Sequence, residues 1–178
     1  ILLHLIEVPE GRKLRSGIDR AERERQVISP LEEVAEQAAV PARTLIKITH
    51  RISQGIIDTA AEEGCNFIVL GRQKRPAFLD RVFSSLIDTV LQKAPTEVAV
   101  LHGTFDAESI RTILVPYGSS VHSRLAMEIA PALAQHFRAN LKMTLVHARG
   151  ASQAEKDEKV RRANEMIGEF SMPASLVV

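Results

Sequence analysis

The sequence predicts an α/β protein built on doubly wound parallel sheets. Two observations carry this prediction. Short β-branched runs alternate with amphipathic helical stretches along the whole chain, and the strand-like runs are continuously apolar, as in strands that are covered on both faces. Such alternation favours parallel strands joined by right-handed helical crossovers. We expect one nearly complete unit followed by part of a second.

The first unit is expected to cover residues 1–103 and to begin in a strand that Pro9 and Gly11 end. A charge-rich helical segment follows over residues 19–38, and Pro30 indicates a fresh helix start within it. The side chains predicted for its buried face lie at helical spacing: Leu31, Val34, Ala35 and Ala38. Alternating β-branched residues then predict a strand over residues 44–48.

The remainder of the first unit repeats the pattern. A helical stripe from Ile52 to Ala61 ends at Gly64, and a buried strand over residues 67–70 is closed by Gly71. A basic loop leads to a helix that carries Phe83 to Leu91. The last strand of the unit is predicted over residues 98–101.

Residues 104–111 are polar and read as a linker, after which the pattern restarts over residues 112–178. The expected elements are strands at 112–115, 141–147 and 175–178, with helices at 123–137 and 152–167. Val40-Pro-Ala42 and Met172-Pro-Ala174 each precede a strand, which suggests two copies of one unit. The alternative is a single α/β domain without a repeat.

Composition excludes several classes of function. The 178 residues carry 23 Lys+Arg against 22 Asp+Glu, so the chain has almost no net charge. It therefore lacks the positive electrostatic field with which a protein neutralises the phosphates of a nucleic acid. One Tyr and six Phe, without Trp, give little stacking surface for single strands. The lone Cys65 fits a reducing, cytoplasmic compartment. No apolar run approaches the ~18 residues of a membrane helix.

Two stretches resemble the universal stress protein family. The segment FIVLGRQKRPAFLDRVFSSLIDTVLQKAPTEVAVL, residues 67–101, is similar to the family's fourth strand, phosphate loop, helix and last strand. The segment IRTILVPYGSSVHSRLAMEIAPALAQ, from Ile110, is similar to its opening strand, loop and first helix. The resemblance implies the strand order 3-2-1-4-5 in each unit. The first unit would then lack its first strand and helix, and the second would be the first half of such a unit.

The resemblance also implies a nucleotide-binding loop. Nucleotide-binding members carry Gly-x2-Gly-x9-Gly-Ser/Thr, in which glycines admit phosphates to the backbone and the final Gly-Ser opens a helix. Gly71 fits the first position and Ser85 the hydroxyl position, whereas Lys74 and Ser84 replace the other two glycines. The motif is therefore degenerate, and ATP or ADP is a possible ligand without being a certain one.

Charged and polar residues surround this loop and its counterpart in the second unit. Arg72 and Arg75 are possible phosphate contacts, and the alternative is that they are solvated loop charges. The second loop contains Gly118, Ser119 and Ser120, and Gly118 stands where the family places an Asp near the nucleotide. A turn with a Ser-capped helix also explains this second loop.

No enzyme signature or metal-ligand spacing is evident elsewhere. His4 and His147 end apolar strands and are predicted to be satisfied histidines of the core or rim. Ser84 and Ser85 have no visible base partner, so nucleophilic catalysis is not supported.

We therefore expect a non-catalytic regulatory or binding module. The segment VPARTLIKITHRISQGIIDTA, residues 40–60, resembles domains attached to the cytoplasmic end of amino-acid permeases and cation antiporters. A membrane transporter portion of the same polypeptide is the expected partner. The alternative is a stand-alone ATP-binding universal stress protein. Val98–Leu101 is uncharged and apolar, and an exposed strand edge of this kind predicts a homodimer, or pairing between the tandem units, through residues 97–102.

Overall fold

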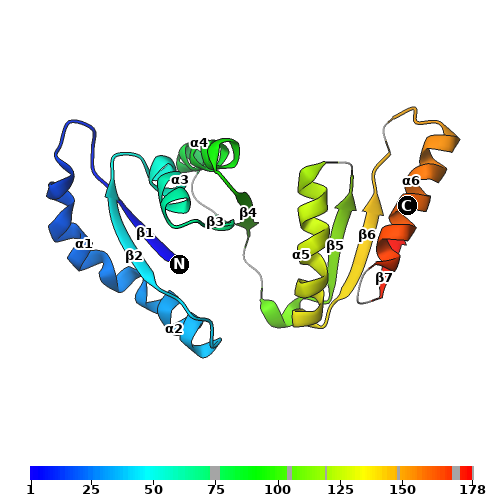
Figure 1. Cartoon of the computed structure of the whole chain (residues 1–178), viewed down its shortest axis with the longest axis horizontal. Helices are drawn as coiled ribbons and strands as arrows, with labels where there is room; N and C mark the ends of the chain where they lie inside the picture. The colour runs from blue at the N-terminus through cyan, green and yellow to red at the C-terminus, as the bar shows by residue number, and fades with distance from the viewer. Residues whose placement is uncertain (73–76, 104–105, 119, 148, 170–172, 178) are drawn as a thin grey trace. The chain divides into compact units, whose positions relative to one another are not determined.

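A computed structural model describes the chain except residues 73–76, 104–105, 119, 148, 170–172 and 178. Side chains are also left undescribed at 72, 77–84, 107 and 121. The predicted α/β class with parallel strand pairs is confirmed. Contacts between residues divide the chain into two compact units, Ile1–Gly103 and Thr104–Val178, which are coloured blue to green and green to red in Figure 1.

The first unit opens with a parallel strand pair. Strand β1 (Leu2–Glu7) pairs with β2 (Thr44–Thr49) in a register that joins Leu2 to Thr44 and Glu7 to Thr49. The connection contains four short helical elements: η1 (Leu14–Gly17), α1 (Ile18–Glu24), η2 (Arg25–Val27) and α2 (Ser29–Gln37). Pro30 lies in the first turn of α2, where its missing N–H costs nothing, as predicted.

The predicted buried face of this helical segment is wrong. In α2, Leu31 and Val34 are 54% and 61% exposed, and no residue of the helix is buried. Helix α1 packs against β2, whereas α2 meets this strand through a hydrogen bond that Thr44 Oγ1 donates to Glu32 Oε1. Ile28, between η2 and α2, is the buried apolar residue of this segment.

The second half of the first unit also forms a strand–helix–strand pattern. Helix α3 (Ile52–Glu62) is followed by Gly64, whose φ of +60° allows the N–H of Cys65 to reach the carbonyl of Ala60 at 2.8 Å. Strand β3 (Phe67–Arg72) follows, then α4 (Ala77–Lys93) and β4 (Glu97–His102). Strands β3 and β4 are parallel over their whole length.

Within the first unit, the described strands form two separate hydrogen-bonded pairs, β1-β2 and β3-β4. These are the neighbours that the order 3-2-1-4-5 requires if the first strand of the unit is missing. The complete strand order stays a prediction.

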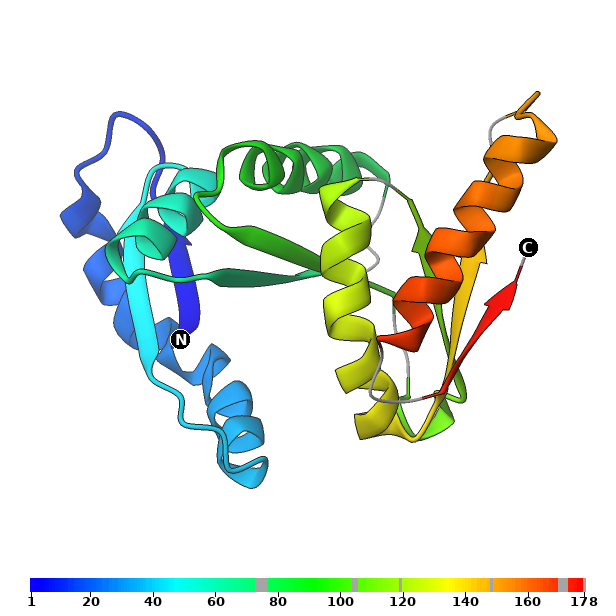
Figure 2. The ribbon, with the colours of Figure 1, turned by 45° about the vertical axis from the view of Figure 1, so that its right-hand side comes forward.

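The second unit contains one parallel sheet with the order β5-β6-β7. Its elements are η3 (Ala107–Ser109), β5 (Thr112–Tyr117), α5 (Val121–Phe137), β6 (Asn140–Leu145), α6 (Gln153–Gly168) and β7 (Ala174–Val177). Side chains of α5 and α6 enter the same buried cluster as Val115 and Met143, so both helices cover one face of the sheet (Figure 2). The assignment of this unit as the first half of a repeat stays a prediction.

Candidate functional site

The predicted nucleotide loop joins β3 to α4. Gly71, in β3, is exposed, its φ lies outside the left-handed region, and a Cβ placed there would meet nothing within 4 Å. Neither backbone conformation nor space therefore demands glycine at this position. Lys74 and Arg75 lie outside the described residues, and the side chains of Arg72 and Ser84 are likewise not described.

The two serines of the motif lie inside a helix. Helix α4 begins at Ala77, so Ser84 and Ser85 do not stand at the start of a helix, as the family motif would place them. Interior helical N–H groups donate to carbonyls one turn earlier and are not available to a phosphate. The carbonyl of Ser85 also accepts a hydrogen bond from Thr89 Oγ1 at 2.7 Å. Ser85 is exposed, so its side-chain hydroxyl, unlike its backbone groups, can still bind a ligand.

The corresponding loop of the second unit is a helix cap. Ser120 is the N-cap of α5, and its Oγ accepts the N–H of Ser123 at 3.2 Å and lies 3.0 Å from Ser123 Oγ. A Cβ at Gly118 would lie 3.0 Å from the same Ser123 Oγ, so a longer side chain there requires Ser123 to move. Ser119 lies outside the described residues. The capped-helix interpretation of this loop fits these contacts.

The two strand-end histidines differ. His4 Nε2 lies 2.9 Å from Glu24 Oε2, as expected of a satisfied histidine. Hydrogen bonds from Arg20 first and His4 second lower the pKa of Glu24. Both ring nitrogens of His147 are shielded from solvent and have no partner among the described residues, so the prediction of a satisfied His147 stays a prediction. The sequence gives no signal that separates these two histidines.

A charged cavity of about 470 Å³ adjoins His147 at the start of α6. Its charged lining comprises Arg149, Glu155, Glu158, Lys159 and Arg162. The carboxylates have partners: Glu155 Oε2 accepts the N–H of Ser152 at 2.8 Å, and Glu158 accepts hydrogen bonds from Arg161 and Arg162. Lys159 donates only to the carbonyl of Val146, at 3.3 Å, within the described residues.

The hydrogen bonds of α6 set the charge of its acidic residues. Those from Ser152 lower the pKa of Glu155, and those from Arg161 and Arg162 lower the pKa of Glu158 to about 2. Both carboxylates are therefore ionised at neutral pH, and both are already engaged by the chain itself.

The described residues form neither a metal site nor a membrane-spanning helix. Over the part of the chain that the structure describes, no three His, Cys, Asp or Glu side chains gather as a metal site would require. No helix of that part is long and apolar enough to span a bilayer.

Comparison with known proteins decides the family. A sequence model of the universal stress protein family matches residues 1–102, more than half of the chain. The chain belongs to the universal stress protein family. No curated protein matches its sequence. A universal stress protein from Archaeoglobus fulgidus DSM 4304 is similar in structure, with a TM-score of 0.65 and 18% identity over 100% of this chain and 67% of that one.

Membership of the universal stress protein family agrees with the resemblance seen in the sequence and with the parallel α/β fold. The family match covers the β3–α4 loop but not the second unit, whose relation to the family stays a prediction from the sequence pattern. At 18% identity the structural likeness to the Archaeoglobus fulgidus protein shows the fold alone.

Proposed function

We propose that this universal stress protein is a non-catalytic regulatory or binding module with a degenerate nucleotide-binding loop. The placement of Ser84 and Ser85 carries the proposal, because both lie within α4 and away from its first turn. A phosphate would then lack the free helical N–H groups that normally hold it. Lys74 and Ser84, in place of glycines, reduce backbone access further.

Calorimetry with ATP and magnesium tests this proposal. We expect no binding heat and no rise in melting temperature at millimolar nucleotide, because a ligand that binds only the folded state must raise its stability by mass action. A matched variant restores the motif through Lys74→Gly and Ser84→Gly. Micromolar binding of ATP by the unaltered chain would contradict the proposal and favour the alternative, a stand-alone ATP-binding universal stress protein.

The proposed setting is the cytoplasmic side of a membrane transporter. It is supported by the resemblance of residues 40–60 to domains attached to permeases and antiporters. The complete reading frame that encodes the chain separates the two settings. Several apolar spans in the same frame would support attachment to a transporter, and a short frame without such spans would end that part of the proposal.

A further inference from the structure

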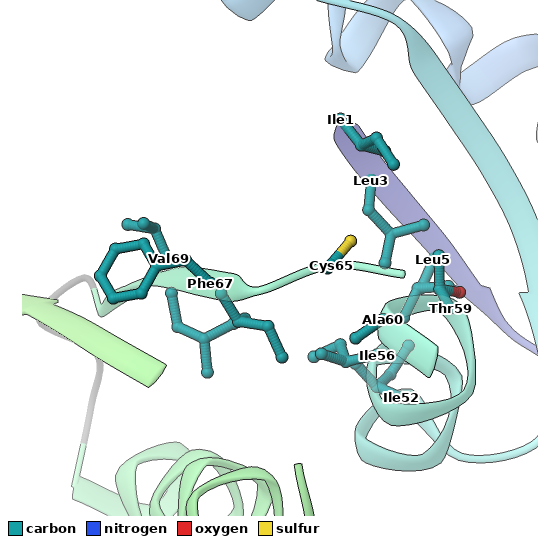
Figure 3. Close-up of a pocket in the computed structure, with 12 residues that line it drawn as sticks. Ile1, Leu3, Leu5, Ile52, Ile56, Thr59, Ala60, Cys65, Phe67 and Val69 are labelled. Carbon is teal, nitrogen blue, oxygen red and sulfur yellow. The ribbon is translucent and has the colours of Figure 1, made fainter. Parts of the chain in front are cut away.

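Two apolar surfaces of the first unit differ in what can cover them. Leu3, Leu5, Phe67 and Val69 line a pocket between β1 and β3 (Figure 3). The predicted strand order 3-2-1-4-5 gives this position to the unit's own first strand, so the pocket is expected to be filled by the fold itself. The other surface lies in the connection from β1 to β2, all of whose residues the structure describes.

This connection begins with a turn that mixes basic and apolar side chains, in the dark blue segment between β1 and α1 in Figure 1. Arg12, Lys13 and Arg15 are exposed. Between them, Leu14 is 42% exposed, and Ile18, at the start of α1, is 50% exposed. We call these five residues the basic–apolar turn. Apolar side chains that stay in water among cations indicate an interaction surface.

The backbone of the basic–apolar turn is fixed against the strand pair. Gly17 is buried, and a Cβ placed on it would lie 2.8 Å from Ile48 Cγ2. The N–H of Ser16 donates to the carbonyl of Lys13 at 2.9 Å, within the short helix η1. The five side chains of the turn are therefore presented to solvent from a folded and anchored backbone.

The acidic neighbours of the turn do not neutralise it. Glu10 forms an ion pair with Arg51, with 2.7 Å between Oε1 and Nε, and Glu24 is held by Arg20. From the basic–apolar turn up to Asp19, the chain carries three positive charges and one negative charge. The turn is therefore a local positive patch in a chain that has almost no net charge.

The exposed apolar side chains of α2 have the opposite electrostatic surroundings. Leu31 and Val34 are exposed, and the charged residues of this helix are all acidic: Glu32, Glu33 and Glu36. Thr44 donates a hydrogen bond to Glu32, which places α2 beside the start of β2, whereas the basic–apolar turn follows the end of β1. Because β1 and β2 are parallel, the acidic helix and the basic turn lie at opposite ends of the strand pair.

We propose that the basic–apolar turn binds to the anionic headgroups of a lipid bilayer. The negative potential of such a surface attracts the three cations, while Leu14 and Ile18 enter the boundary between headgroups and acyl chains. A nucleic acid would satisfy the cations but would leave the two apolar side chains in water. Repulsion of the acidic α2 from the same surface orients the strand pair, with the carboxyl ends of its strands toward the bilayer.

This binding needs neither a nucleotide nor an attached transporter. It can therefore fail while the proposed function stands, and the proposed function can fail while the binding stands. A single patch of this size gives weak, reversible association with a bilayer. Each basic residue near an anionic surface should strengthen the association about fivefold.

Cosedimentation with sucrose-loaded vesicles tests the proposal. The whole chain should pellet with vesicles that contain about 30% phosphatidylserine in phosphatidylcholine, and should stay in the supernatant with phosphatidylcholine alone. Raising the salt from about 0.1 M to about 1 M shortens the screening length from about 10 Å to about 3 Å and should release the chain.

Two triple variants test which cations bind. Arg12→Gln, Lys13→Gln and Arg15→Gln together should weaken binding about a hundredfold, because three contributions of about fivefold multiply. The matched variant removes three exposed cations of the second unit and should leave binding unchanged: Arg124→Gln, Arg138→Gln and Lys142→Gln.

A single introduced Trp tests the apolar part of the surface. The chain contains no Trp, so the fluorescence of Leu14→Trp reports on that position alone. With anionic vesicles its emission should shift to the blue and be quenched by brominated acyl chains. The matched control Leu133→Trp on α5, where the leucine is 43% exposed, should show neither change.

Several results would overturn the inference. The unaltered chain could stay in the supernatant with anionic vesicles at low salt, or the triple variant of the turn could pellet as well as the unaltered chain. An unshifted Leu14→Trp emission, or equal binding after Leu14→Ser and Ile18→Ser, would show that the turn responds to charge alone, as a nucleic acid or an acidic protein presents it. Circular dichroism checks that each variant is folded, and Lys13→Gln alone, with an expected loss of about fivefold, replaces a triple variant that unfolds.

Discussion

Among the described acidic residues, Glu158 has the most strongly lowered pKa. Hydrogen bonds from Arg161 and Arg162 lower its pKa from 4.5 to about 2. A carboxylate whose pKa is lower in the folded than in the unfolded state stabilises the fold above the unfolded pKa. That stabilisation is lost as the pH falls from about 4.5 to about 2.

Titration of the Glu158 carboxyl by NMR tests this shift. We expect a midpoint near 2 in the unaltered chain. Arg161→Gln and Arg162→Gln together should move the midpoint upward, toward the ordinary glutamate value. Arg138→Gln, which removes a charge that lies outside this group of ion pairs, should not move it. An unchanged midpoint in the double variant would mean that these arginines do not hold the carboxylate.

Among the helices and strands, α6 has the best-defined local interaction, a capping box at its N-terminus. Ser152 and Glu155 exchange hydrogen bonds across the first turn, with Glu155 N–H donating to Ser152 Oγ at 3.3 Å and Ser152 N–H donating to Glu155 Oε2 at 2.8 Å. Ser152→Ala should lower the free energy of unfolding by about 1 kcal/mol, because an N-terminal donor of the helix loses its partner.

Urea denaturation measures this cost. The matched control is Ser175→Ala on β7, an exposed serine that caps no helix, which should change stability by no more than about 0.5 kcal/mol. Equal effects of the two substitutions would show that the cap contributes nothing specific to α6.

Element positions could be predicted from the sequence where local chemistry fixes them. Gly64 follows α3 and Pro30 lies in the first turn of α2, because φ and the missing proline N–H act within a few residues. The start of α4 could not be predicted, since the family motif places a helix opening at Ser84 whereas helical residues begin at Ala77. The spacing of residues within a sequence motif does not determine at which residue the backbone hydrogen bonds of a helix begin.

Burial and the candidate site were predicted less completely. The apolar spacing in α2 is that of a buried helix, yet Val34 is exposed, and α2 meets β2 through a hydrogen bond from Thr44 to Glu32. Likewise, His4 and His147 look alike in sequence, but among the described residues His4 meets a carboxylate and His147 has no hydrogen-bond partner. The burial of α2 and the hydrogen bonding of the two histidines both depend on tertiary neighbours, which periodicity and residue type do not specify.

For the whole molecule, the remaining prediction concerns association through β4. Its described partner is β3 alone, so the other edge of Glu97–His102 is available for pairing, and Leu101 on this strand is 50% exposed. Uncharged apolar edges favour strand-to-strand association unless a charge blocks them. We therefore expect light scattering after size exclusion to give the mass of a dimer.

The variant Leu101→Lys places a charge on that edge and should shift the chain to the monomer mass while it stays folded. Leu133→Lys on α5, where the leucine is 43% exposed, is the matched control and should leave the dimer intact. A monomer mass for the unaltered chain would refute pairing between chains. A dimer that persists in Leu101→Lys would place the interface elsewhere.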